Sequence, residues 1–487
     1  MSVLTLCPMA LCLLAGILVG VSRGRWERSV HKITAGALIV NLLLTVLICL
    51  QPSEALSLTL FHITAELPIA FAVDTVGKLF SLLIAFVWLM VAIAAFEYMP
   101  HEGAEARFFG FYLAVAGILS ALCYSGNMVT YYLFFEMMSL ISMPLVLHSL
   151  SHEAIMAALK YLFYSMAGAF MMLFGLFLFA ARGSDLAFVP GGCLQGMTGD
   201  MTAQVALFLM IVGFGTKAGM FPMHGWLPTA HPVAPAPASA VLSGVITKAG
   251  VLGIIRVVYY MAGVDALAGT WVQKAWAWLT LVTVFMGSMM AYQENVLKKR
   301  MAYSTVSQVS YVLFGLSAMH PVAFTGALLH VVFHSLVKDT LFLSAGAIIL
   351  KTGRTKVSEL AGICRQMPVV MWCFTLVSIT LIGIPPTSAF LSKWYLAMGS
   401  LAGGLPVLSW LGPVVLLISA LLTAGYLLTI SIKGFFPEKG EAVDLTLCEP
   451  GWHFLVPMVV MTVLAVGLGI WAGPLISVIR QAAAVLF

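Results

Sequence analysis

Long apolar stretches, separated by short polar connections, follow one another along almost the whole chain. Each has the length that an α-helix, rising about 1.5 Å per residue, needs to cross a hydrocarbon core of ~30 Å. None shows the alternation of apolar and polar positions that a β-barrel strand requires. The pattern therefore predicts an all-α membrane protein with about fourteen transmembrane helices, in these stretches: 3–21, 32–51, 71–96, 107–125, 128–148, 156–181, 203–222, 236–262, 269–292, 300–318, 323–350, 367–398, 408–433 and 452–476.

The composition agrees with a membrane protein. Hydrophobic residues make up 61% of the 487 residues, only 9% are charged, and the mean hydropathy is +1.04. Soluble domains carry roughly 25% charged residues, so a soluble globular class is excluded. The first stretch lacks a basic leader and a small-residue cleavage site, and we interpret it as a retained helix rather than a signal peptide.

Lysine and arginine are unevenly distributed among the connections between stretches. The even-numbered connections carry Arg182 and little else, and the segment 52–70 has neither residue type. Because basic connections stay on the cytoplasmic side, this distribution predicts that both termini lie on the outer side of the cell membrane. The basic residues of the odd-numbered connections are Arg23, Arg25, Arg28, Lys32, Arg107, Lys298, Lys299, Arg300, Lys351, Arg354, Lys356, Arg365, Lys433 and Lys439.

Two stretches contain prolines and glycines that should interrupt a helix. The seventh reads GFGTKAGMFPMHGWLP (213–228), and the twelfth reads LIGIPPTSAFLSKWYL (381–396). Proline removes a backbone donor and clashes with the preceding turn, so we expect breaks near Pro222 and Pro385–Pro386. Prolines are also common in transmembrane helices as simple kinks. Because a lysine accompanies each break, we favour a role in transport.

The two interrupted helices are five helices apart. Interrupted helices at matching positions of two halves indicate an inverted repeat, here helices 4–8 and 9–13. The chain is accordingly divided into the first three helices, the two repeats, and the last helix with its tail: 1–106, 107–262, 269–433 and 434–487.

Ionisable residues occur inside several apolar stretches, where a charge is costly and usually faces an ion pathway. Glu136 lies near the middle of the fifth stretch, and Lys217 is expected at a similar depth in the seventh. An opposite charge within ~4–6 Å favours both charged forms, while desolvation opposes them. We predict that breaking and remaking this pair switches the proton affinity of the lysine. Alternatively, Glu136 is a hydrogen-bonding residue between packed helices.

The remaining candidates lie in the eighth, eleventh and twelfth stretches. Lys248 is too far from either membrane surface to reach it, so we interpret it as a deprotonatable amine in a hydrated cavity. His330, His334 and Lys338 recur at i, i+4 and i+8 and line one helix face. The histidine pair is alternatively a metal site, although no carboxylate or third histidine is placed to complete it. Lys393 follows the proline pair, and together these groups predict a proton relay.

Three other charged residues are interpreted as structural. Asp74 and Lys78, at i and i+4, are expected to form an ion pair at the start of the third helix. Lys160 is expected to extend to the membrane surface, with a role near Glu136 left open.

Known cofactor motifs are absent from the sequence. There is no Walker A motif, no GxGxxG fingerprint and no Gly-x-Ser-x-Gly elbow. We therefore expect this chain to bind no cofactor or metal, and to be driven by an ion gradient or by partner subunits. The eight cysteines are scattered without a CxxC pair, at positions 7, 12, 49, 123, 193, 364, 373 and 448.

Several long segments resemble one known superfamily. They are similar to the antiporter-like subunits shared by respiratory complex I, Mrp-type cation/proton antiporters and membrane-bound hydrogenases, and AHPVAPAPASAVLSGV is most similar to hydrogenase-linked and Mrp-type members. The segments are GTKAGMFPMHGWLPTAHPVAPAPASAVLSGVITKAG, LKKRMAYSTVSQ, HVVFHSLVK and GIPPTSAFLSKWY.

The resemblance implies the same fourteen helices, inverted repeats and broken helices 7 and 12. The sequence departs from the family at Phe333, where a polar residue is frequent, and at Asp339, where a small neutral residue is usual. An acid beside Lys338 is expected to raise the proton affinity of that lysine. The positions that match the family's pairing glutamate and its relay groups are Glu136, Lys217, Lys248, His330, His334, Lys338 and Lys393.

The residues and the resemblance together predict a proton-translocating membrane subunit of a redox-driven complex, either an NADH/quinone oxidoreductase or a membrane-bound hydrogenase. Its expected partners are the other membrane and hydrophilic subunits, and no nucleic acid is expected. A subunit of an Mrp-type Na⁺/H⁺ antiporter is the first alternative. A subunit that itself reduces quinone is disfavoured because the sequence has no redox ligand set, and a self-sufficient metabolite permease is the least supported.

Overall fold

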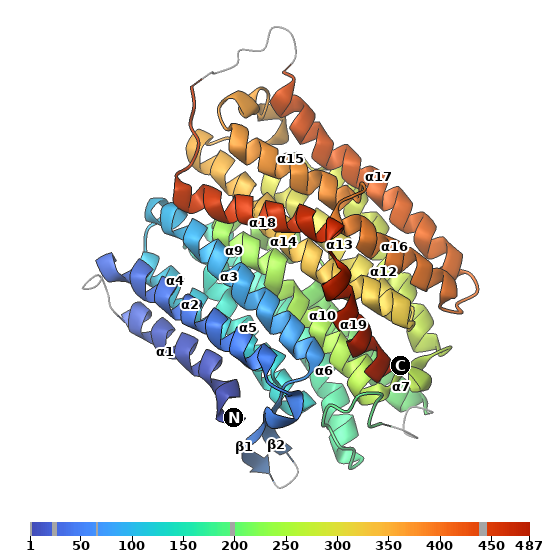
Figure 1. The fold of residues 1–487 in the computed structure, drawn as a ribbon. Helices are drawn as coiled ribbons and strands as arrows, with labels where there is room; N and C mark the ends of the chain where they lie inside the picture. Colours follow the sequence, from blue (N-terminus) through green and yellow to red (C-terminus); the bar gives the residue numbers. More distant parts are fainter. Residues whose placement is uncertain (1, 22–26, 65–66, 195–199, 438–445) are drawn as a thin grey trace.

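The structure, a computed structural model, describes residues 2–21, 27–64, 67–194, 200–437 and 446–487. Helices dominate it and run side by side as a bundle (Figure 1). Among the basic residues used to predict orientation, Arg23, Arg25 and Lys439 lie outside the described residues, as does the side chain of Arg28.

The first third of the chain forms six long helices and one β-hairpin. The hairpin pairs β1 (Ser57–Thr64) with β2 (Leu67–Ala72) in antiparallel register and connects the second helix to the third. The helices are α1 (Cys7–Val21), α2 (Glu27–Leu50), α3 (Thr75–Glu102), α4 (Glu105–Cys123), α5 (Met128–Val146) and α6 (His152–Ala181).

The middle of the chain is less regular. Two π-helical segments, Leu242–Ile246 and Arg256–Ala262, join short helices into one continuous span over residues 236–262, which we call span 8. The helices of this region are α7 (Met201–Ala218), α8 (Leu227–Val233), α9 (Ala236–Val241), α10 (Thr247–Ile255) and α11 (Val264–Leu267).

The last third contains the long central helix α14 and the C-terminal helices. Its helices are α12 (Trp271–Gln293), α13 (Leu297–Ser317), α14 (Pro321–Thr352), α15 (Pro368–Ile382), α16 (Ser388–Ala402), α17 (Leu408–Phe435), α18 (Trp452–Ile470) and α19 (Gly473–Leu486).

Among the described residues, twelve helices are long and apolar enough to cross a membrane. The more polar helix α13 and the interrupted pair α15–α16 account for the other two predicted crossings. The expected breaks are confirmed: α7 ends at Ala218 before α8 begins at Leu227, and α15 ends at Ile382 before α16 begins at Ser388. The chain is therefore a multi-pass membrane protein with fourteen crossings in its described part.

Side-chain caps start several of these helices. The Asn127 amide oxygen accepts from the backbone of Thr130 at the start of α5, and Asp200 accepts from Ala203 at the start of α7. Such caps satisfy backbone donors that have no partner within the helix. The bond from Ala203 holds the pKa of the Asp200 carboxyl below its usual value.

Backbone hydrogen bonds join the even-numbered connections at one end of the bundle. Because the β-hairpin lies there, we call it the hairpin end; α1 begins and α19 ends at the same end (Figure 1). The opposite end, which carries Lys298, Lys299, Arg300, Lys351 and Arg354, we call the basic end. The bonds at the hairpin end run from Ala72 to Tyr124 (2.8 Å), Gly126 to Ala70 (2.9 Å), Phe188 to Gly126 (2.9 Å) and Val189 to Tyr260 (3.1 Å).

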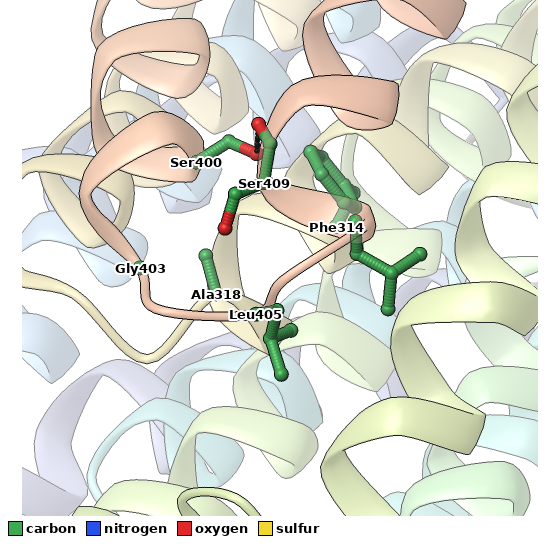
Figure 2. A pocket seen from close by; sticks show the side chains of 7 residues that line it. Phe314, Ala318, Ser400, Gly403, Leu405 and Ser409 are labelled. Atoms are coloured by element: carbon green, nitrogen blue, oxygen red, sulfur yellow. Dashed lines mark hydrogen bonds between the residues drawn. The ribbon is translucent and has the colours of Figure 1, made fainter.

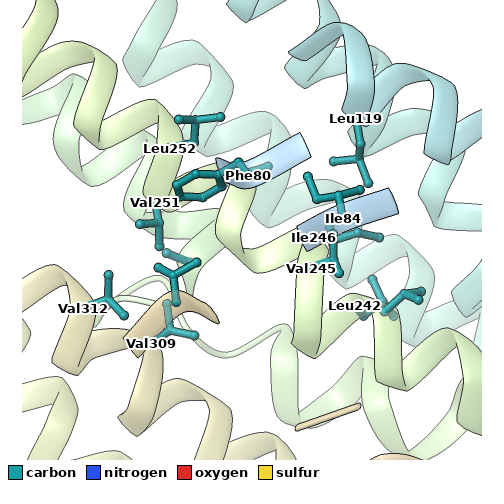
Figure 3. Packing of buried hydrophobic residues seen from close by; sticks show 14 of the residues in the cluster. Phe80, Ile84, Leu119, Leu242, Val245, Ile246, Val251, Leu252, Val309 and Val312 are labelled. Atoms are coloured by element: carbon teal, nitrogen blue, oxygen red, sulfur yellow. The ribbon is translucent and has the colours of Figure 1, made fainter. Parts of the chain in front are cut away.

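Span 8 and α14 form the centre of the bundle. All of the apolar window in span 8 and 94% of that in α14 are buried, far more than in the peripheral α1 and α2. Figure 3 shows the apolar side of span 8 against α3, α4 and α13, with residues such as Phe80, Leu119 and Val309. The polar groups of span 8 and α14 therefore lie in the interior rather than facing lipid.

The segment 52–70 is a connection between helices, as predicted, but it contains most of a β-hairpin that was not predicted. LTLFHIT alternates β-prone residues over a length sufficient for a strand, and β1 pairs with β2. The last stretch, predicted as 452–476, is divided because Gly473 and Pro474 start a separate helix, α19.

Candidate functional site

Lys217 lies in the last turn of α7, immediately before the break, and only 1% of its surface is exposed. Its ammonium donates hydrogen bonds to Ser139 Oγ (2.9 Å), the Tyr161 hydroxyl (2.5 Å) and Ser165 Oγ (3.2 Å), from α5 and α6. It also lies 4.2 Å from the centroid of the Tyr161 ring. Because hydroxyl groups both donate and accept, this set of partners suits an ammonium and a neutral amine alike.

The break after Lys217 is built by residues of the predicted motif. Gly219 adopts a left-handed conformation (φ 80°), which glycine tolerates best, and ends α7. The Trp226 indole then donates to the carbonyl oxygen of Thr216 (2.9 Å), and the backbone N–H of Phe221 donates to Thr283 Oγ1 (3.0 Å). The second bond satisfies a backbone donor that the break would otherwise leave unpaired, and the first ties the segment after the break to the end of α7.

Glu136 and Lys217 share a site without forming an ion pair. Ser139, which binds Lys217, lies one helical turn from Glu136 on α5. No salt bridge to Glu136 occurs within the part of the chain that the structure describes, and its Oε1 is buried without a hydrogen-bond partner. The hydroxyl groups of Ser139, Tyr161 and Ser165, rather than Glu136, bind the Lys217 ammonium. The predicted direct pair is therefore open in this structure.

Lys248 is buried at the centre of span 8 and contacts α14. Its Nζ lies 2.7 Å from His334 Nδ1 and donates to the carbonyl oxygen of Ser243 (2.5 Å). Ser243 belongs to the first π-helical segment, where the regular hydrogen-bond pattern of span 8 is disturbed. The contact between Lys248 and His334 unites two predicted site residues that lie 86 positions apart in the sequence.

The two histidines of α14 continue this polar line. The ring centroids of His330 and His334 are 6.0 Å apart, and His330 Nδ1 lies 2.9 Å from Ser392 Oγ on α16. The Nε2 atoms of both rings are buried without a hydrogen-bond partner. Within the described residues, no group of three or more His, Cys, Asp and Glu side chains is arranged to hold a metal ion. The line from Lys248 thus leads through both histidines to α16.

Lys338 and Asp339 point to different neighbours. Lys338 donates to Ser304 Oγ (2.6 Å) and to the Met301 carbonyl (3.2 Å) on α13. The Asp339 carboxyl instead packs against Gly244 of span 8, since consecutive residues of a helix point about 100° apart. The Lys338 ammonium and the Asp339 carboxyl therefore face different elements, α13 and span 8, and the expected effect of the acid on the proton affinity of Lys338 stays a prediction.

Lys393 lies on the second segment of the interrupted twelfth crossing. Its Nζ donates to the carbonyl oxygens of Leu381 (2.7 Å) and Ile382 (2.8 Å), the last two residues of α15. It also lies 5.2 Å from the centroid of the Tyr311 ring. The side chain therefore bridges the break and caps the carbonyl end of α15, where the helix dipole favours a cation.

Beyond Lys393, α16 continues towards the hairpin end and borders a small pocket (Figure 2). Ser400 lines this pocket seven residues after Lys393, two turns along the same helix face, and donates to the Ser409 carbonyl (3.0 Å). The other lining residues are apolar or small: Phe314, Ala318, Gly403, Leu405 and Leu408.

The charged residues interpreted as structural are placed differently from the prediction. Asp74 does not pair with Lys78; it accepts two hydrogen bonds from the Arg256 guanidinium (2.7 and 2.8 Å) and one from the Tyr260 hydroxyl. Lys78 donates instead to the Gln51 carbonyl (2.6 Å). Arg256 was missed, although an arginine inside an apolar stretch is a signal that a buried acid lies nearby.

Lys160 and His231 are two further groups near the interruption of the seventh crossing. Lys160 donates to Thr229 Oγ1 on α8 (3.0 Å), so it reaches the second segment of the interrupted helix. His231, also on α8, is fully buried, stacks on Phe342 at 4.7 Å, and has no hydrogen-bond partner at either ring nitrogen. It was overlooked because the sequence placed it in a connection between helices.

This chain is similar to known proteins over most of its length. The family described as "NADH:quinone oxidoreductase/Mrp antiporter, TM" matches residues 125–433. NADH-quinone oxidoreductase subunit N of Desulforudis audaxviator is 33% identical over 85% of this chain and 84% of the relative. A Na(+)/H(+) antiporter subunit of Bacillus subtilis is 29% identical over 77% of this chain and 74% of the relative.

Solved structures share the fold of this chain. A chain of the Mrp complex from a Dietzia species superposes on 100% of this chain and 97% of its own length, with a TM-score of 0.87 and 22% identity. The matched family segment contains all seven residues predicted to form the relay. The chain is therefore an antiporter-like membrane subunit that belongs to the NADH:quinone oxidoreductase/Mrp antiporter family.

Proposed function

We propose that this chain moves protons across the cell membrane as the ion-translocating subunit of a larger redox-driven complex. The observation that carries the proposal is the line of buried polar contacts from Lys248 through His334 and His330 to Ser392, the neighbour of Lys393. Titratable groups at such depth are expensive and are retained where charge must pass. The relatives support a complex of this kind, because one of them is a subunit of an NADH-quinone oxidoreductase.

Each relay residue has a proposed role. Protons enter from the basic end near Lys217 and Lys248, cross the middle through His334 and His330, and leave past Lys393 at the hairpin end. Glu136 acts as the electrostatic trigger: when it approaches Lys217 it stabilises the ammonium, and when it withdraws it releases the proton.

Further details of the relay and of the orientation belong to the same proposal. Lys338 of α14 lies beside the main line of relay residues and donates a hydrogen bond to Ser304 of α13. The basic end faces the cytoplasm, so both termini lie on the outer side.

The energy is proposed to come from partner subunits, with no cofactor bound by this chain. The chain would transmit a conformational or electrostatic signal from those subunits to its lysines. Spectroscopic and metal analysis of the isolated chain tests this point. A flavin, cluster or quinone that co-purifies with it would contradict the proposal.

The decisive test uses the purified native complex in sealed vesicles, with proton uptake measured alongside electron transfer. Lys217→Ala and Glu136→Gln should each lower the protons moved per electron by roughly tenfold or more, since positioned proton-transfer groups contribute on the order of 10²-fold or more. The matched control is Lys274→Ala, an exposed lysine on α12. If both variants pump like the unchanged complex, the assigned roles are wrong.

A second candidate function is an Mrp-type sodium/proton antiporter, supported by the relationship to the Na(+)/H(+) antiporter of Bacillus subtilis. In that case a sodium gradient alone would drive proton movement through the complex, without any electron donor. Proton flux in response to a sodium pulse separates the two functions. The partner subunits identified in the native complex provide an independent distinction.

A further inference from the structure

Asp339 is a buried acid that the relay described above does not use. It lies on α14, is 0% exposed, and neither of its carboxyl oxygens has a hydrogen-bond partner. An ionised carboxylate in such a place would lack both solvent and a counter-charge in contact, at a cost far greater than that of a neutral acid. The side chain is therefore expected to hold a proton in this conformation.

The neighbours of Asp339 place it on the same surface as Lys248. A Cβ atom added to Gly244 would overlap Asp339 Oδ2, so the carboxyl packs directly on the backbone of span 8. Ser335, one turn earlier on α14, donates to the Gly244 carbonyl (2.6 Å) and fixes this contact. Lys248 lies one turn beyond Gly244 and faces the same helix.

The groups around the carboxyl come from three elements. Lys248 of span 8 lies one turn from the Gly244 contact, the Tyr112 hydroxyl of α4 donates to the Trp88 carbonyl (2.8 Å), and Lys338 on its own helix is turned towards α13. Lys248 is thus the ionisable amine of span 8 that faces α14 beside this contact. The π-helical segment Leu242–Ile246 precedes Lys248 in span 8 and contains the Gly244 contact. Two of its carbonyl oxygens accept hydrogen bonds from side chains, that of Ser243 from Lys248 and that of Gly244 from Ser335.

We propose that Asp339 is a second proton-holding residue of the relay, exchanging its proton with Lys248. In the forward step the carboxyl O–H bond breaks and a new N–H bond forms on the neutral amine of Lys248, which leaves a carboxylate beside an ammonium. The reverse step restores the neutral pair, and no other bond changes. Asp339 thereby provides Lys248 with the acid that Glu136 provides for Lys217. This inference rests on the proposed function.

The test uses the native complex with Asp339→Asn, which keeps the size of the side chain but cannot release a proton. Pumping should fall roughly tenfold, as expected for the loss of a positioned proton-transfer group. The infrared spectrum of the unchanged complex minus that of the variant should contain a carboxylic-acid C=O band, because the acid is protonated at rest. The matched control is Asp265→Asn, an exposed acid on α11.

A second variant addresses the position of the acid. Gly244→Ala introduces the Cβ atom that meets Asp339 Oδ2, so it should displace the carboxyl and reduce pumping while the acid remains present. Assembly of each variant is checked by the subunit content of the purified complex. If Asp339→Asn reduces pumping but removes no carboxylic-acid band, the residue is structural and the inference is overturned.

The variant Lys393→Met distinguishes a failure of this inference from a failure of the proposed function. If the Asp339→Asn complex pumps normally while the Lys393→Met complex does not pump, only the role of Asp339 is overturned. Normal pumping by both variants would overturn the relay, and this inference with it.

Discussion

The two interrupted crossings hold their lysines in different ways. Lys217 precedes its break and is surrounded by three hydroxyl groups, whereas Lys393 follows its break and binds two backbone carbonyls of α15. Hydroxyls adjust to either charge state of an amine, but carbonyls only accept. The first site is therefore suited to switching between charge states, and the second to stabilising a cation at a helix C-terminus.

The two halves also differ in how their polar groups connect. From Lys248 to Ser392 the polar groups follow each other across α14. The hydroxyls of Ser139, Tyr161 and Ser165 form a hydroxyl cluster around Lys217, and within the described residues no hydrogen bond joins this cluster to Lys248. Gly250 of span 8 packs against the backbone of α7 between the two sites. Under the proposed function, control of proton movement would lie at this gap, where hydration or a side-chain movement would complete the line.

The largest expected effect comes from a charge pair that belongs to neither lysine site. Asp74→Asn leaves Arg256, which is 1% exposed, without its counter-charge. Breaking a fully buried pair in this way costs about 3–5 kcal/mol; because 29% of the Asp74 side chain is exposed, we expect the lower end of this range and a clear fall in the thermal midpoint of the complex. Asp265→Asn, which changes an exposed acid on α11, is the control and should leave the midpoint unchanged. A complex that loses pumping but no stability would mean that this pair belongs to the relay.

The next effect distinguishes the two lysines directly. Lys393→Met should destabilise the complex by about 1–3 kcal/mol, because the carbonyls of Leu381 and Ile382 lose their donor. Lys217→Met should cost less, since the Tyr161 hydroxyl retains a bond to Ser142 Oγ (2.6 Å). Thermal unfolding of the two purified variants measures the difference. Equal losses would remove the distinction between the carbonyl and hydroxyl sites.

A smaller effect is expected at the shortest bond of the hydroxyl cluster. Tyr161→Phe removes the hydrogen bond to Lys217 and the one to Ser142, whose hydroxyl keeps a bond to the Ser139 carbonyl, and should cost roughly 0.5–1.5 kcal/mol in total. Proton movement should slow, because the lysine retains only two of its three partners. Pumping assays at several rates of electron transfer would reveal the slower proton movement. An unchanged rate would show that the hydroxyl does not take part in switching.

The smallest effect is expected at Ser165, whose bond to Lys217 is the longest of the three at 3.2 Å. Ser165→Ala should cost only about 0.5 kcal/mol, the lower end for a hydrogen bond. Paired with Tyr161→Phe in a double-mutant cycle, it tests whether the hydroxyls act as one unit. Strict additivity of the two losses would argue that each hydroxyl binds Lys217 independently.

The crossings could be predicted because membrane thickness fixes the length of an apolar helix. Even α13, with Lys298, Lys299 and Arg300 in its first turn, was predicted from the stretch 300–318. The breaks were predictable from Pro222 and Pro385, because proline acts on the backbone locally. The β-hairpin was missed, since a short strand outside the membrane gives a much weaker signal than a twenty-residue helix.

The candidate site was predictable in its residue types but not in its contacts. Spacing places His330, His334 and Lys338 on one face of α14, as predicted, yet it does not say which neighbour each one meets. The contact between Lys248 and His334 depends on how span 8 is rotated, and its π-helical segments shift that rotation. The same limitation explains why Asp74 was paired with Lys78 rather than with Arg256. The roles of the relay residues remain predictions.

The polarity of α13 and α14 has a consequence for biogenesis. α13 falls below the hydropathy that twelve other helices reach, and α14 carries two histidines, a lysine and an acid in its interior. A charged residue near a helix centre opposes release from the translocon by about 2.5–3.5 kcal/mol. We expect that neither helix partitions alone, and that both are retained beside the translocon until their partners cover the polar faces, span 8 for α14 and α17 for α13.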